Sequence, residues 1–163
     1  MSRPQSPEIN LITIREIKGL IDALEELIQD TSNESASGNS LENINAFSVG
    51  KIPKINIEDY FSRIIKYSKL QIGSFIAMMI YLDKAAEKLD ITFYNIHRLI
   101  LGALICAIKY TCDNSQNNHF FAKVGGISYH EVCLLESTFL VLIDYRLYIS
   151  EDEYQKYFSF IRQ

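Results

Sequence analysis

The sequence contains no tryptophan and has only three cysteines and three prolines among its 163 residues. An odd number of cysteines cannot pair completely within one chain. Disulfide frameworks are typical of small secreted domains, so Cys106, Cys112 and Cys133 are interpreted as reduced thiols. A chain of this length can bury a sufficient hydrophobic core without disulfide bonds or a bound metal. We therefore expect a cytoplasmic or nuclear protein.

The sequence also lacks an excess of positive charge. Its net charge is −4, whereas a nucleic-acid-binding or membrane-surface protein is expected to carry a basic patch. The N-terminal MSRPQSPEIN has no apolar core of the kind found in signal peptides. The uncharged run Leu99–Ile108 is ten residues long, against about 20 for a membrane span. Neither a nucleic acid nor a membrane is expected as a partner.

Enzyme motifs are missing as well. Gly125-Gly126 is followed by Ile127, not by the Lys-Ser/Thr of a phosphate-binding loop. His130 and Cys133 lie three residues apart on one predicted helix, but zinc sites normally need three or four ligands. We expect no metal, no cofactor and no catalytic site. A metal-dependent helical enzyme stays open as an alternative that rests on His130 and Cys133 alone.

What the sequence does have is apolar residues at helical spacing along most of its length. No strand-like alternation and no repeat of solenoid length is present. The pattern predicts an all-α fold of five core helices with one further helix at each end. It divides the chain into an N-terminal amphipathic helix over 1–29, a polar linker over 30–46 and a domain over 47–163. The helices are expected at 8–28, 56–68, 72–88, 92–112, 119–124, 129–144 and from 150 onward.

The uncharged run Leu99–Ile108 is expected to lie in the central helix. A helix that is apolar on every side is normally enclosed by other helices. Its small residues, including Gly102 and Cys106, would let neighbouring helices approach closely.

Four charged residues interrupt otherwise apolar helical patterns: Arg63, Asp83, Lys109 and Glu136. Buried unpaired charges are costly, so each should have a partner. Two structural ion pairs inside the bundle would satisfy them. Alternatively, some of these charges lie at the rim of a groove and bind the backbone of another chain. The residues alone leave both interpretations open.

Several segments resemble the P/U-type cyclins, a single-box group known from fungal phosphate-responsive pathways, plants and protists. Tyr81–Lys84 is similar to that family's Y-I-D-R motif, and Ala122–Ser128 to its Y-A-K-V-G-G-I-S run. The other matching segments are Ile57–Ile64, Ile91–Leu99, Ala107–Tyr110 and Leu135–Leu147. The similarity extends over about 47–158, so it implies a single five-helix cyclin box with an additional N-terminal and C-terminal helix.

The resemblance implies a non-enzymatic regulatory subunit that binds a cyclin-dependent serine/threonine protein kinase and holds its C-helix in the active position. By the same resemblance, Lys109 and Glu136 would bond the kinase backbone, with Tyr110, Leu140 and Tyr145 as apolar neighbours. Arg63 and Asp83 would form a buried structural ion pair between the first two box helices. The alternative within this fold is a cyclin-fold scaffold or adaptor without kinase activation.

Overall fold

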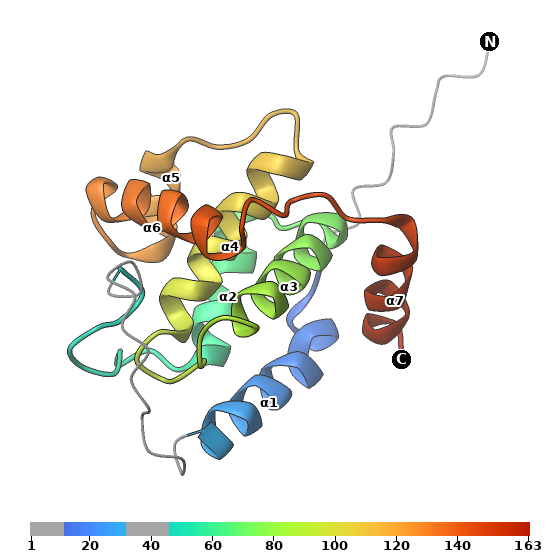
Figure 1. Ribbon diagram of the computed structural model, residues 1–163, viewed down its shortest axis with the longest axis horizontal. Coiled ribbons are helices and arrows are strands. Elements are labelled where there is room, and N and C mark those ends of the chain that lie inside the picture. The colour runs from blue at the N-terminus through green and yellow to red at the C-terminus, as the bar shows by residue number, and fades with distance from the viewer. Residues whose placement is uncertain (1–11, 32–45) are drawn as a thin grey trace.

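The computed structural model describes residues 12–31 and 46–163, and its elements are all helices (Figure 1). The predicted all-α fold is therefore confirmed. The helices are α1 (Ile14–Thr31), α2 (Ile57–Ser68), α3 (Ile72–Ala86), α4 (Ile96–Thr111), α5 (Asn118–Gly125), α6 (Tyr129–Leu142) and α7 (Glu151–Ile161). None of these helices is both long and apolar enough to cross a membrane.

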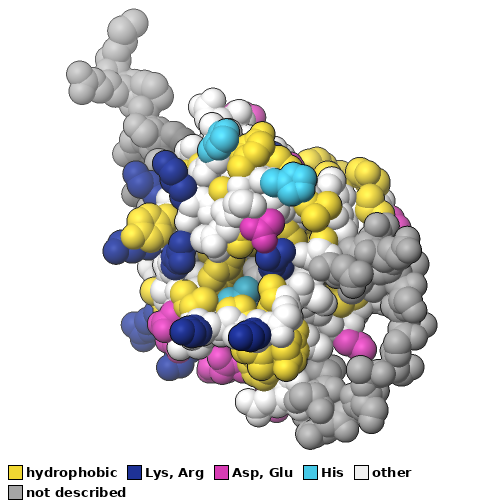
Figure 2. All heavy atoms as spheres, turned by 90° about the vertical axis from the view of Figure 1, so that its left-hand side faces the viewer, with side chains coloured by type: hydrophobic (Ala, Val, Ile, Leu, Met, Phe, Trp, Pro, Cys, Tyr) yellow, Lys and Arg dark blue, Asp and Glu magenta, His cyan; other side chains and the backbone are white. Residues whose placement is uncertain are grey.

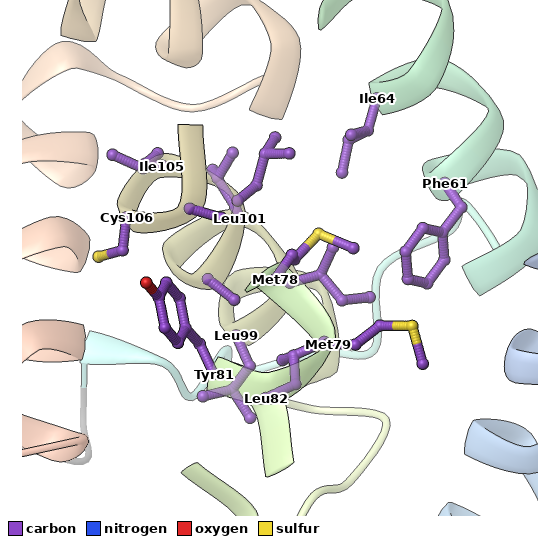
Figure 3. Close-up of a cluster of buried hydrophobic side chains, with 14 of the residues drawn as sticks. Phe61, Ile64, Met78, Met79, Tyr81, Leu82, Leu99, Leu101, Ile105 and Cys106 are labelled. Atoms are coloured by element: carbon purple, nitrogen blue, oxygen red, sulfur yellow. The ribbon is translucent and has the colours of Figure 1, made fainter. Parts of the chain in front are cut away.

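Helix α4 is the centre of the bundle, as the uncharged run predicted. It packs most extensively against α3 and α6 and also contacts α2 and α5. Every residue from Leu99 to Ile108 is buried. Figure 3 shows Leu101, Ile105 and Cys106 of α4 in one cluster with side chains of α2 and α3. Each large aliphatic side chain enclosed in this way contributes about 1.5–3 kcal/mol to the free energy of unfolding.

Close packing between α4 and α6 depends on Gly102. A Cβ atom at this position would lie 2.9 Å from Cδ2 of Phe139 on α6. The Phe139 ring in turn meets the buried ring of Phe47 edge-on, with ring centroids 6.2 Å apart. The segment before α2 is thereby tied to the same α4–α6 interface.

The helix starts follow the capping signals in the sequence. The Asn56 side chain accepts a hydrogen bond from the Asp59 N–H, and Ser150 accepts one from the Glu153 N–H. Ser128 and Glu131 form a complete capping box at the start of α6. These side chains satisfy N–H groups that a helix leaves without a backbone partner.

The turn between α5 and α6 is built on Gly125-Gly126. Gly126 has φ +69°, a left-handed conformation that glycine adopts without the Cβ penalty. A Cβ on Gly126 would also lie 3.2 Å from the Arg63 guanidinium, and one on Gly125 would lie 2.4 Å from the Leu101 side chain. Gly125 therefore leaves room for the buried Leu101 side chain, and Gly126 allows the left-handed turn.

Helix α1 buries its apolar stripe against the rest of the molecule. Ile17, Ile21 and Ile28 are at most 2% exposed. The backbone N–H of Ile12 donates to the Leu70 carbonyl, with the nitrogen and oxygen 3.1 Å apart, which fixes the start of the helix beside the end of α2. The predicted polar linker lies mostly outside the described residues, which resume at 46.

Helix α7 lies at the margin of the bundle (Figure 1) and has no fully buried residue. It packs on α3, where the Tyr157 hydroxyl donates to the Asp83 carboxylate. The chain leading to it is held by the Tyr81 hydroxyl, which donates to the Leu147 carbonyl at 2.7 Å.

An ion pair not predicted from the sequence joins the starts of α4 and α6. Arg98 Nη2 lies 2.7 Å from Glu131 Oε1, and Arg98 Nη1 donates to the Ala46 carbonyl at 3.1 Å. The Ser128 backbone N–H, the Arg98 guanidinium and the Ser128 hydroxyl hold the pKa of the Glu131 carboxyl at about 2, below its usual 4.5. One carboxylate therefore caps α6 and connects it to α4.

We predict that Gly126→Ala lowers the free energy of unfolding by about 1–2 kcal/mol, the usual penalty of a left-handed conformation for a residue with a Cβ. Gly50→Ala is the matched control, because its added Cβ meets no atom within 4 Å. Urea denaturation of both variants measures the difference. Equal midpoints for the two variants would contradict this role of Gly126.

A second prediction concerns pH. The pKa of Glu131 is lower in the folded chain than its ordinary 4.5. The Glu131 carboxylate therefore stabilises the fold fully above pH 4.5, and this stabilisation is lost as the pH falls toward about 2. Glu131→Gln keeps the size of the side chain and removes the charge. Its urea midpoint should lie below that of the wild type at neutral pH, and the difference should shrink in acid. A difference that stays constant across this range would show that the Glu131 charge is not the cause.

Candidate functional site

Lys109 and Glu136 form an ion pair where the end of α4 meets the middle of α6. Lys109 Nζ lies 2.7 Å from Glu136 Oε1. The two side chains are 31% and 22% exposed, so the pair lies at the edge of the core with one side open to solvent. The structure thus brings together two residues that are 27 positions apart in the sequence and that sequence reasoning assigned to one site.

Asn118, the first residue of α5, completes the pair. Its Nδ2 donates to Glu136 Oε2 at 3.0 Å and also lies 3.4 Å from Cys133 Sγ. Both carboxylate oxygens of Glu136 are therefore engaged, one by α4 and the other by α5. Asn118 was missed by sequence reasoning because it belongs to an asparagine-rich stretch, in which nothing distinguishes one amide from the next.

Cys106, in α4 near Lys109, is buried and 4% exposed. Burial, reinforced by the nearby Glu136 carboxylate, raises the pKa of Cys106 to about 12. The thiolate is the reactive form of cysteine, and at this pKa Cys106 is protonated at neutral pH.

Apolar and aromatic residues lie near the ion pair along α4 and α6. Tyr110 follows Lys109 and is half exposed, and Tyr145 lies just beyond α6 and is 64% exposed. Leu140, one helical turn after Glu136, is on the same side of α6 and is partly buried. Leu134 and Val141 are also exposed, but they lie on the side of α6 that faces away from Glu136. A charged pair with exposed tyrosines nearby has the composition of a protein-binding site.

The predicted ion pair between Arg63 and Asp83 is wrong. Arg63 Nη2 donates to the Lys123 carbonyl of α5 at 2.9 Å, and Asp83 is exposed and accepts from Tyr157 of α7. Within the described ranges the two residues form no ion pair with each other. Arg63 lies on the side of α2 that faces α5, and Asp83 lies on the side of α3 that faces α7.

The histidines are placed as packing or surface residues. His97 is buried, its Nε2 lies 2.8 Å from the Ile55 carbonyl oxygen, and burial lowers its pKa. His119 stacks on Tyr129 with ring centroids 4.2 Å apart. His130 is exposed beside the partly buried Cys133. In the part of the chain that the structure describes, no three His, Cys, Asp or Glu residues are grouped so as to hold a metal ion.

Comparison with known proteins decides the family. The family model described as Cyclin matches residues 9–147. The chain belongs to the cyclin family. The matched segment includes α1 through α6 and ends before α7, so the N-terminal helix lies within the cyclin match and the C-terminal helix lies beyond it.

Individual cyclins confirm the P/U-type resemblance. The chain is 36% identical to Cyclin-U4-2 of Arabidopsis thaliana over 151 residues, which cover 88% of this chain and 70% of that cyclin. It is 31% identical to Cyclin-U4-3 of the same plant over 147 residues, which cover 88% of this chain and 67% of that cyclin. It is 36% identical to the PHO85 cyclin-like protein psl1 of Schizosaccharomyces pombe over 115 residues, which cover 68% of this chain and 47% of that protein. Cyclins as a family are regulatory proteins rather than enzymes.

We predict that Asn118→Ala lowers the free energy of unfolding by about 1–3 kcal/mol, the range for losing a hydrogen bond to a partly buried charged group. Asn114→Ala, in the exposed loop before α5, is the control and should leave stability unchanged. Urea denaturation monitored by circular dichroism measures both. Equal loss in the two variants would contradict the assigned role of Asn118.

Proposed function

We propose that this cyclin is the regulatory subunit of a cyclin-dependent serine/threonine protein kinase, and that it holds the kinase C-helix in the active position. Membership of the cyclin family supports the class of partner. The fission-yeast relative is itself named as a cyclin-like protein of PHO85. A cytoplasmic or nuclear location is part of the same proposal.

The observation that carries the proposal is the Lys109–Glu136 pair at the edge of the core. A lysine ammonium has three N–H donors and a carboxylate has about four acceptor positions, so Lys109 with one bond and Glu136 with two both keep capacity for a partner. The partial exposure of both side chains makes that capacity accessible to a partner. Lys109 would donate to backbone carbonyls of the kinase, and Glu136 would accept from backbone N–H groups.

The proposed mechanism requires positioning and no chemistry by the cyclin. A protein kinase is active when the lysine of its third strand pairs with the glutamate of its C-helix. A rigid surface that binds the C-helix in this position favours the active state by its differential affinity for it. In this cyclin the carboxylate of Glu136 is held from two sides, and Tyr110, Leu140 and Tyr145 would supply the apolar contact area around it.

The test is affinity capture of the kinase with the full chain, followed by a protein-kinase assay on the captured material. Lys109→Ala and Glu136→Ala should each reduce kinase binding by about tenfold or more, corresponding to about 1.4 kcal/mol. Lys51→Ala and Glu58→Ala are the matched controls, because these charged residues are exposed and lie outside the site. Circular dichroism confirms that each variant is folded.

The possible outcomes separate activator from scaffold. Loss of both captured kinase and kinase activity in the site variants alone supports the proposal. Capture of a kinase whose activity does not depend on the cyclin would favour the scaffold. Unchanged kinase binding by folded Lys109→Ala and Glu136→Ala variants would overturn the assignment of the site.

A further inference from the structure

A second surface, away from the Lys109–Glu136 pair, has the opposite charge from the chain as a whole. An open cleft of about 950 Å³ lies between α2 and α5, with Ile14 of α1 at its edge. Three cations line it: Arg63 and Lys66 from α2 and Lys123 from α5. In the view of Figure 2, Lys and Arg side chains gather on the left-hand half of the surface, where few Asp or Glu side chains are visible. The cleft is therefore a local basic site on an acidic protein.

The three cations are not neutralised within the described parts of the chain. Arg63, Lys66 and Lys123 form no ion pair with a carboxylate there, whereas Lys88, Arg98, Lys109 and Arg146 do. The Lys66 and Lys123 side chains are exposed. A cleft lined by charges of one sign attracts ligands of the opposite sign, and this favours an anionic ligand.

Arg63 is held in place before any ligand binds. Its Nη2 donates to the Lys123 carbonyl at 2.9 Å, and its guanidinium lies beside Gly126. These contacts occupy one of the five N–H donors of the guanidinium and fix its plane. A fixed arginine fork binds an oxyanion at a lower entropic cost than a mobile side chain.

The rest of the cleft is apolar and aromatic. Tyr67 is 58% exposed, Phe120 is partly buried, and Val124 is buried at the cleft wall. The Lys66 ammonium lies 5.6 Å from the centroid of the Tyr67 ring. An anion-binding group beside apolar surface fits a ligand that carries both a charged group and apolar side chains.

We propose that this cleft binds a phosphorylated segment of a partner protein, with the phosphate of a phosphoserine or phosphothreonine between Arg63, Lys66 and Lys123. A phosphate monoester carries a charge of about −1.5 to −2 at neutral pH and has three acceptor oxygens, which match three cationic side chains better than one carboxylate does. Recognition of phosphorylated motifs by arginine clusters is a recurrent mode of peptide binding. An apolar residue next to the phosphoresidue would contact Tyr67 and Phe120. The site does not depend on kinase binding at Lys109 and Glu136.

The test uses the full chain and three fluorescein-labelled peptide libraries of equal flanking composition. The central residue is phosphoserine in the first, serine in the second and glutamate in the third, and the flanking positions are degenerate and include apolar residues. Fluorescence anisotropy measures binding at fixed ionic strength. The phosphoserine library should bind about tenfold more tightly than the serine library, and more tightly than the glutamate library.

Two charge-reversal variants locate the binding. Lys66→Glu combined with Lys123→Glu should reduce phosphopeptide affinity by about tenfold or more. Lys51→Glu combined with Lys54→Glu makes the same change in net charge at exposed lysines outside the cleft, and it should leave affinity within about twofold. Arg63→Lys keeps the charge but loses the planar fork, so it should also weaken binding.

Several results would overturn the proposal: no phosphate-dependent binding by the folded wild type, equal binding of the glutamate library, or equal loss in the two double variants. Binding of anionic lipid vesicles in place of the phosphopeptides would assign the cleft to a membrane surface and would also overturn it. Each of these outcomes is independent of whether the chain captures a kinase.

Discussion

The enclosure of α4 is the constraint from which the rest of the structure follows. A helix with no charge over Leu99–Ile108 must be covered on all sides, and α3, α6, α2 and α5 supply the cover. Gly102 lets α6 come close enough for Phe139 to fill the space beside it. The position of α6, and with it that of Glu136, is therefore set by the packing of the central helix.

The proposed kinase site lies where this enclosure ends. Lys109 is in the last turn of α4, at the point where the helix emerges from the core, and it meets a carboxylate presented by α6. Asn118 connects the same carboxylate to α5, so three helices converge on one charged group. A site built on packed helices in this way holds its side chains in a defined geometry, as positioning of a partner helix requires.

The helices and the central role of α4 could be predicted from the sequence because they depend on local periodicity and capping. The Ser128–Glu131 capping box and the uncharged run are signals within a few residues of one another. The charge pairing could be predicted only in part. Periodicity marked Arg63 and Asp83 as interruptions of apolar stripes, but it did not show which neighbouring helix packs against each side. In the structure Arg63 binds a backbone carbonyl of α5, and Asp83 binds a tyrosine of α7. Arg98 and Asn118 could not be identified because their roles depend on contacts with distant segments.

The position of the kinase contact is tested most directly by photo-crosslinking within the complex. A photoreactive benzoylphenylalanine replaces Tyr110 or Tyr145 in the proposed site, and Tyr94 as a comparably exposed control elsewhere. Mass spectrometry then identifies the crosslinked kinase peptide. We expect crosslinks from positions 110 and 145 to the kinase C-helix region and none from position 94. Crosslinks from position 94 alone, in a complex that still forms, would contradict the proposed position of the kinase contact.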